Sequence, residues 1–136
     1  SSGPRGQSNE ASDAIEKVKQ IFLDSNPVLE CFGNAKTLRN NNSSRFGKYF
    51  ELQFTKYGSP IGGVVTNFLH EKSRVVKPGL GERNFHAFYQ LLASKRMRSL
   101  FNLKSGDGKD YAYLKSSGCY SVDGIDDVQE FEDTFK

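Results

Sequence analysis

A run of nine consecutive residues, from Asn40 to Lys48, places amides, hydroxyls and cations side by side with little apolar surface between them. Serine hydroxyls can coordinate Mg²⁺, asparagine amides can donate hydrogen bonds to phosphate oxygens, and arginine offers a planar fork that matches phosphate or carboxylate. Asn40, Ser43, Ser44 and Arg45 are therefore candidate ligands for a polyphosphate and its metal ion. A solvated turn of the same composition is the alternative.

The residues that follow show the alternation of a half-buried β-strand over 46–56. One face of this predicted strand carries Phe46, Phe50, Leu52 and Phe54. Lys48 falls on the same face. Either its methylene groups are buried while its ammonium group reaches solvent, or the strand begins at Tyr49. Polar loops at strand ends are where α/β folds gather ligand groups.

A second strand should pair with the first. Residues 57–60 have the composition of a turn, and residues 61–69 are again rich in β-branched and apolar side chains. The two runs therefore predict an antiparallel hairpin. Gly62 and Gly63 indicate a bulge or a close backbone approach within it.

Helices are predicted before and after this hairpin in the sequence, and the expected fold class is α/β. The first helix begins near Asp13 and stops before Pro27, after which Asn26 can cap a second short helix that ends at Gly33. Residues 1–12 have almost no hydrophobic anchor and are predicted to be a flexible surface loop or a tag remnant.

The second half of the chain also shows helical spacing. One helix is predicted around an apolar stripe that should face the core, made by Phe85, Phe88, Tyr89 and Leu92. A second helix is predicted at 97–103. A third is predicted from about Asp126, with an acidic face exposed to solvent.

Composition and charge narrow the class of protein. The chain has 136 residues, which is one domain's length, and no apolar run approaches the ~20 residues needed to cross a bilayer. No apolar signal segment opens it, and Cys31 and Cys119 have no partner at metal-ligand spacing, so we expect a soluble protein with reduced thiols and no zinc site. Residues 36–98 hold twelve Lys or Arg against three acids, which would attract an anion.

Other kinds of active site find less support. His86 falls inside a predicted helix, where a structural role is favoured over catalysis, and His70 has no ligand or nucleophile near it in the sequence. Neither a Gly-x-Ser-x-Gly elbow nor the phosphate cradle Gly-x-x-x-x-Gly-Lys-Ser/Thr occurs. Without that cradle the chain alone should bind nucleotide with a dissociation constant of about 1 mM or worse.

Four stretches of the chain resemble the myosin motor head, in that family's order and spacing. The polar run Asn40-x-x-Ser43-Ser44-Arg45-Phe46-Gly47-Lys48 resembles its switch I loop, and the runs at 29–37, 71–76 and 81–92 resemble neighbouring segments. Kinesins share the Asn-x-x-Ser-Ser-Arg core but not the Phe-Gly that follows it here. The similarity covers about residues 13–128, and residues 60–64 look most like the unconventional class I myosins.

The resemblance implies an internal fragment of a P-loop NTPase-like motor domain, with residues 13–136 in that domain and the hairpin in its central twisted sheet. It implies that Asn40 donates to the nucleotide phosphates, that Ser44 ligates Mg²⁺, and that Ser43 lies beside the terminal phosphate and the attacking water. Arg45 would pair with a glutamate of switch II, so that Ser43 and Arg45 would serve catalysis.

The implied function is that of one part of an actin-based motor that binds and hydrolyses ATP with Mg²⁺. The implied partners are actin filaments, ATP, and light chains or calmodulin on a neck outside this chain, with no nucleic acid, and the implied location is the cytoplasm, on the actin cytoskeleton. The isolated chain lacks the phosphate cradle, so it is predicted to be inactive alone.

Two alternatives of other classes stay open at this point. Arg45, Lys48 and Lys56 are interleaved with the aromatic residues Tyr49 and Tyr57, as in a module that binds single-stranded nucleic acid. The third reading is an interaction domain that does no enzymatic work.

Overall fold

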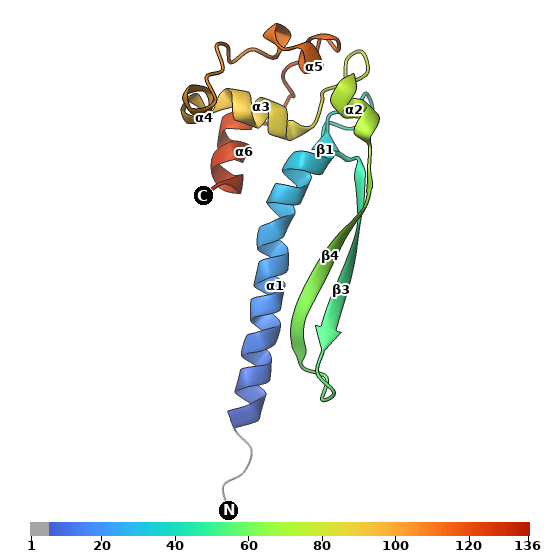
Figure 1. Cartoon of the computed structure of the whole chain (residues 1–136), viewed down its shortest axis with the longest axis vertical. Coiled ribbons are helices and arrows are strands. Elements are labelled where there is room, and N and C mark those ends of the chain that lie inside the picture. Colours follow the sequence, from blue (N-terminus) through green and yellow to red (C-terminus); the bar gives the residue numbers. More distant parts are fainter. Residues whose placement is uncertain (1–5) are drawn as a thin grey trace, which may run out of the picture.

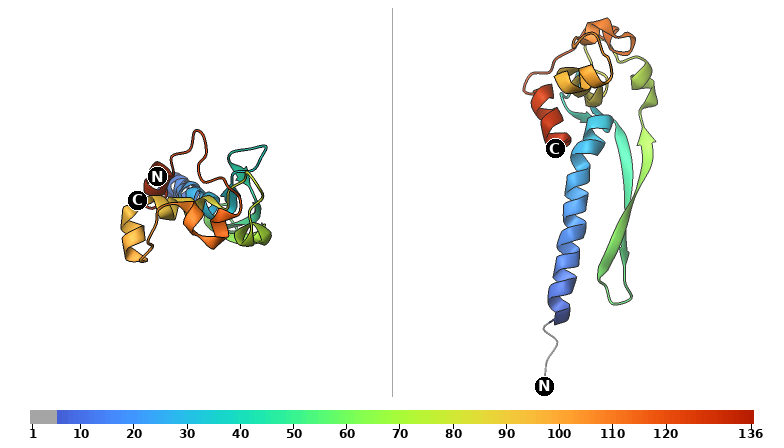
Figure 2. Two further views of the ribbon diagram at one scale, coloured as in Figure 1. Left: turned by 90° about the horizontal axis from the view of Figure 1, so that it is seen from above. Right: turned by 60° about the vertical axis from the view of Figure 1, so that its left-hand side comes forward.

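The computed structural model describes residues 6–136, apart from the side chains of residues 6–11, 67 and 68. One part of it, which we call the limb, consists of helix α1 (Gly6–Gly33) beside the hairpin of strands β3 (Phe46–Phe54) and β4 (Pro60–His70) (Figure 1). The shorter helices gather at the end of the limb where α1 finishes, and the C-terminus lies there too. Turning the molecule shows the same division (Figure 2).

We call this gathering, residues 34–45 and 71–136, the compact end. Its elements, in chain order, are β1 (Asn34–Ala35), β2 (Ser43–Ser44), α2 (Lys72–Val76), α3 (His86–Ala93), α4 (Lys95–Leu100), the 3₁₀ turn η1 (Gly108–Asp110), α5 (Ala112–Lys115) and α6 (Asp127–Thr134). The described residues therefore combine helices with two small antiparallel sheets, β1–β2 and β3–β4.

Helix α1 departs from the prediction at both ends. It begins at Gly6, within the segment predicted to be flexible, whereas residues 1–5 lie outside the described part. It also continues through Pro27 to Gly33, so the predicted break and second short helix are wrong. Pro27 removes the N–H that would bond the carbonyl of Leu23. Contacts with the hairpin offset that loss, because the rings of Phe22 and Phe50 meet edge to face at 4.8 Å.

Lys48 supplies a second tie between α1 and the hairpin. Its ammonium donates to Asn26 Oδ1 on α1 and lies 4.7 Å from the centre of the Phe22 ring. Lys48 is therefore part of strand β3 with its stem half-buried, and its charge finds a partner on the helix.

The antiparallel hairpin is confirmed, with Phe46 opposite His70 and Phe54 opposite Pro60. An irregularity between Gln53 and Phe54 leaves Ile61 as an extra residue on β4, which confirms the bulge predicted beside the glycine pair. At the second of these glycines the close neighbour is a ring rather than a backbone, because a Cβ on Gly63 would lie 2.6 Å from Phe50 Cζ.

The far half of the hairpin is less covered than the alternation predicts. Leu52 and Phe54 stand on the predicted core face, yet they are 45% and 55% exposed. Helix α1 therefore buries only the part of this face near Phe50.

The core lies in the compact end. Tyr89, Leu92 and Leu114 are buried together, with Phe88, Leu103, Tyr111 and Tyr120 packed against them. The predicted stripe on α3 is confirmed, since Phe85 is also buried and Phe88 is half-buried. Helix α4 lies slightly before its predicted range.

Helix α6 begins where predicted, because the Asp126 carboxylate accepts from the N–H groups of Val128 and Gln129. Its acidic face is not wholly solvated, as Asp127 is held in an ion pair with Arg83.

Cys31 and Cys119 both lie in the described part and form no disulfide. Within that part, no helix has the length and apolar character that a bilayer crossing requires.

Candidate functional site

The polar run forms a loop whose two ends are clamped together. Strands β1 and β2 pair, with Asn34 opposite Ser44 and Ala35 opposite Ser43, and the Arg45 N–H donates to the Gly33 carbonyl at 2.8 Å. A Cβ on Gly33 would lie 2.1 Å from Phe46 Cδ1, so only glycine lets this ring pack against the end of α1. The loop therefore projects from a rigid base.

A tight turn leads into the loop. The N–H and hydroxyl of Thr37 both donate to the Asn40 carbonyl, and the Asn40 N–H donates back to the Thr37 hydroxyl. The Asn40 side chain folds forward, so that its Oδ1 accepts the Asn42 N–H at 2.9 Å. This bond uses the amide oxygen, and the Nδ2 donors of Asn40, an exposed residue, have no partner among the side chains and backbone that the structure describes.

The two serines differ in their surroundings. Ser43 is half-buried, and its Oγ accepts a long hydrogen bond of 3.5 Å from Arg45 Nη1. Ser44 is exposed, and its hydroxyl has no hydrogen-bond partner among the residues whose side chains are described. Asn40 and Ser44 are thus exposed residues of one loop, and their amide N–H donors and hydroxyl have no partner in the described part of the chain.

Arg45 makes a two-pronged ion pair within the chain. Its Nε lies 2.8 Å from Glu71 Oε2 and its Nη2 lies 2.9 Å from Glu71 Oε1. Hydrogen bonds from Arg45, and then from Arg74, lower the pKa of Glu71 to about 2 against the cost of desolvation. The resemblance predicts a switch II glutamate as the partner of Arg45, but here its fork is held by Glu71.

Glu71 is shared with a second arginine, which extends the network to the start of the loop. Arg74 is almost fully buried, with its Nε 2.6 Å from Glu71 Oε2 and its Nη1 2.9 Å from Glu82 Oε2. Glu82 Oε1 in turn accepts the N–H of Leu38. Two arginines and two glutamates alternate, so the network is neutral and holds both flanks of the loop.

A separate buried chain of contacts lies beneath the middle of the loop. Asn42 Oδ1 accepts from His86 Nε2 at 2.9 Å and from Asn34 Nδ2 at 3.1 Å. Arg83, fully buried over the Tyr89 ring, points its Nη2 at His86 Nδ1. Burial, followed by the Arg83 charge, lowers the pKa of His86 to about 4.

The other end of this chain is fixed by helix α6. The two terminal nitrogens of Arg83 lie 2.8 and 2.9 Å from the carboxylate oxygens of Asp127. Desolvation of the guanidinium is offset by this paired geometry and by the ring beneath it.

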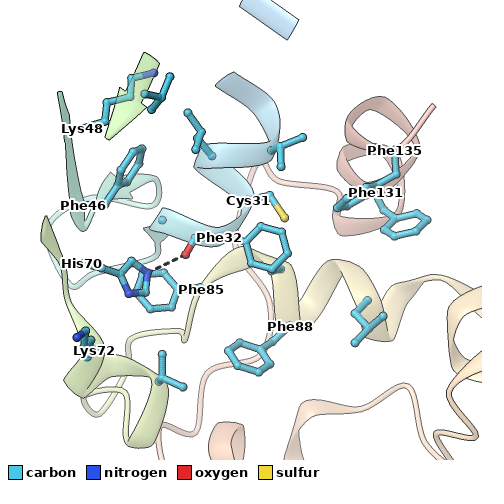
Figure 3. Close-up of a pocket in the computed structure, with 17 residues that line it drawn as sticks. Cys31, Phe32, Phe46, Lys48, His70, Lys72, Phe85, Phe88, Phe131 and Phe135 are labelled. Carbon is cyan, nitrogen blue, oxygen red and sulfur yellow. Dashed lines mark hydrogen bonds between the residues drawn. The ribbon is translucent and has the colours of Figure 1, made fainter. Parts of the chain in front are cut away.

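A cavity beside the compact end has a different character. It measures about 630 Å³ and lies between the C-terminal turns of α1, the hairpin, α3 and α6. Figure 3 shows its aromatic walls, with His70 bonded to the Phe32 carbonyl and stacked on Phe85. Apolar walls of this kind suit hydrocarbon surface and not a polyphosphate, so the polar loop is the better candidate site.

Sequence reasoning found the loop but not its supports. Glu71, Asn42, His86 and Arg83 were not predicted as site residues. Asn42 lies in the loop itself, whereas Glu71 and His86 contact the loop from 26 and 44 residues away in the sequence. The spacing Glu71-x-x-Arg74 could have indicated one pair, because residues three apart meet on a helix turn. Among the described residues, no group of three or more His, Cys, Asp or Glu side chains could hold a metal ion.

The loop of residues 40–48, the β1–β2 pair at its base and the helices around it are the features to compare with known proteins. The chain belongs to the myosin head (motor domain) family, whose model matches residues 5–136.

Its relatives are class I myosins. It is 59% identical to the myosin ID heavy chain of Dictyostelium discoideum over 124 residues, which is 90% of this chain and 11% of that protein. It is 56% identical to the myosin IB heavy chain of the same organism over 121 residues, 89% of this chain and 11% of that protein. It is 58% identical to myosin heavy chain IB of Acanthamoeba castellanii over 123 residues, 90% of this chain and 10% of that protein. The chain therefore spans about a tenth of the length of these relatives.

Proposed function

We propose that this chain supplies the switch I loop of an actin-based motor head that binds and hydrolyses ATP with Mg²⁺. The observation that carries the proposal is that one exposed loop with a clamped base holds an Asn40 amide and a Ser44 hydroxyl, neither of which donates to another described residue. Family membership supports it, since the loop falls within the matched residues.

The donor set fits a magnesium nucleotide. The loop itself uses only the Oδ1 of Asn40, which leaves the Nδ2 donors available, and an amide N–H is a suitable donor to a phosphate oxygen. The Ser44 hydroxyl is a hard oxygen ligand of the kind that Mg²⁺ accepts. A single hydroxyl is too little to hold the ion, so the other ligands would come from the nucleotide, water and other parts of the head. The bound ion would neutralise charge on the phosphates.

Ser43 and Arg45 would serve the hydrolytic step by positioning. Ser43 would lie beside the terminal phosphate and orient the attacking water. Arg45 keeps one Nη1 edge outside its Glu71 pair, and this edge could meet the switch II carboxylate without breaking that pair. Glu71 would then hold the arginine in place for its second partner.

The wider setting of the proposal follows from the family. The hairpin would belong to the central twisted sheet of a P-loop NTPase-like head, and actin filaments would be the partner of the complete head. Light chains or calmodulin would bind a neck outside this chain, and the protein would act in the cytoplasm on the actin cytoskeleton.

The test is steady-state MgATP turnover by the complete head. Ser44→Ala and Asn40→Ala should each lower kcat by about 100-fold, because each removes a preorganised polar contact to the reacting group. Ser121→Ala, at an exposed serine of the compact end, is the matched control and should leave turnover unchanged. The isolated 136-residue chain should show no turnover above background. Full turnover in both loop variants would refute the proposal.

A further inference from the structure

The middle of the loop is anchored from below by a histidine on another element. Asn42 sits between the proposed phosphate donor Asn40 and the proposed catalytic Ser43, and its side-chain oxygen accepts the buried His86 Nε2 hydrogen at 2.9 Å. The Asn42 backbone N–H is held in turn by Asn40 Oδ1. A displacement of Asn42 would therefore also displace the Asn40 side chain that is bonded to it.

Arg83 decides which nitrogen of His86 carries the proton. Its guanidinium has only donors and faces His86 Nδ1 at 3.5 Å, so Nδ1 must act as the acceptor and Nε2 must be the N–H that points to Asn42. The Asp127 carboxylate on α6 fixes Arg83 by two hydrogen bonds. Orientation thus passes from α6 through Arg83 and His86 to the loop.

We propose that His86 is a positioning residue for nucleotide binding, which holds Asn42, and through it Asn40, by a hydrogen bond from its Nε2–H tautomer. This inference rests on the proposed function, because it concerns the use of the same loop. His86 touches neither nucleotide nor metal in this scheme and acts only through Asn42.

Burial supports a neutral histidine in this role. The groups that face it are Arg83, the Asp127 carboxylate behind that arginine, and Asn42 of the loop. The ring therefore stays uncharged near neutral pH and keeps one donor and one acceptor.

The variants should separate the hydrogen bond from the packing. In the complete head, His86→Leu and Asn42→Leu each remove one side of the bond, and His86→Gln keeps an N–H donor. His70→Leu is the matched control, because this second histidine bonds the Phe32 carbonyl and not Asn42. Asn41→Leu is the control for the loop, since Asn41 bonds the Asp123 carbonyl instead.

The readouts are the dissociation constant of a fluorescent magnesium nucleotide, kcat and KM, and amide hydrogen exchange of residues 40–45 without nucleotide. His86→Leu and Asn42→Leu should each weaken nucleotide binding by about tenfold and speed loop exchange, with KM rising more than kcat falls. His86→Gln should recover binding to within about threefold of the wild type. The double variant His86→Leu/Asn42→Leu should lose no more than Asn42→Leu alone, because Asn42→Leu already removes the His86 bond together with the one from Asn34.

Equal losses in His86→Leu and His86→Gln, or additive losses in the double variant, would overturn the inference. Unchanged binding and loop exchange in a folded Asn42→Leu head would overturn it as well. Failure of the wild-type head to bind the magnesium nucleotide would instead refute the proposed function. The exchange of residues 40–45 would still show whether His86 holds the loop.

Discussion

The compact end and the limb are stabilised in opposite ways. In the compact end the side chains with the largest desolvation cost are buried and paired, since Arg83 is 0% and Arg74 6% exposed, each with a carboxylate partner. In the limb, apolar side chains stand in solvent, and Ile61 on β4 is 64% exposed. The buried ion pairs lie next to the loop of residues 40–48. Exposed apolar side chains of the limb lie on the part of the β3–β4 hairpin that extends away from that loop.

This difference has a physical cause and a functional consequence. Buried ion pairs contribute little net stability, but they tolerate only one arrangement, so they fix the direction of the groups they hold. Apolar contacts are less directional, and those between α1 and the hairpin leave the far half of the hairpin exposed. We therefore expect substitutions to have large, specific effects in the compact end and small ones in the limb.

The largest effect is expected from Arg83→Met, which removes one partner of a buried ion pair. It leaves the Asp127 carboxylate without its counter-charge, and the free energy of unfolding should fall by about 3–5 kcal/mol in urea denaturation. Arg39→Met, at an exposed arginine, serves as the control. A loss below 1 kcal/mol in Arg83→Met would mean that the compact end does not depend on this pair.

The same substitution placed in both regions sharpens the contrast. Leu114→Ala empties a site in the core of the compact end, where the side chain is 2% exposed, and should cost about 2–5 kcal/mol. Leu52→Ala in strand β3 should cost less than about 1 kcal/mol, because nearly half of that side chain is already in water. Urea denaturation of the 136-residue chain measures both. Equal losses would show that the limb is as tightly packed as the core.

A smaller, pH-dependent effect is expected from His86. Its pKa falls from 6.5 to about 4 in the folded state, so between these values the unfolded chain binds a proton that the folded chain does not. The free energy of unfolding should therefore decrease as the pH falls through this window, by about 2 kcal/mol between pH 7 and pH 5. Above pH 6.5 this contribution is fully present.

His86→Gln is the control for this pH dependence, because glutamine does not titrate. Its stability should change much less between pH 7 and pH 5. Glu71, with a pKa of about 2, gives up its own contribution mainly below pH 4.5 and does not obscure the comparison. An unchanged pH profile in His86→Gln would show that His86 is not the titrating group.

Local patterns predicted much of the fold, because their physical causes are local. The hairpin follows from period-two alternation and the stripe of α3 from helical spacing. The end of the first helix was mispredicted at Pro27 because contacts with Phe50 and Lys48 override the local cost of proline. Such contacts join distant parts of the chain, so they produce no periodic pattern in the sequence.

For the same reason, some residues of the candidate site could be predicted from the sequence and others could not. Asn40, Ser43, Ser44 and Arg45 could be identified from residue types within six positions, and the structure places them on one clamped loop. The partners Glu71 and His86 could not, because a carboxylate or an imidazole becomes a support only when folding brings it to a particular atom. The sequence suggested a structural role for His86, but not that its partner would be Asn42 in the loop.

Strand β3 pairs only with β4 among the described residues, so each strand of the hairpin carries an outer row of peptide groups with no sheet partner there. Such rows are templates for further strands, and here they run alongside exposed Leu, Ile and Phe side chains. A preparation of these 136 residues alone would therefore be prone to form oligomers as its concentration rises, through pairing of the edge strands of different molecules. Keeping it monomeric would call for low concentration or for a charged residue placed on the bare side of β3 or β4.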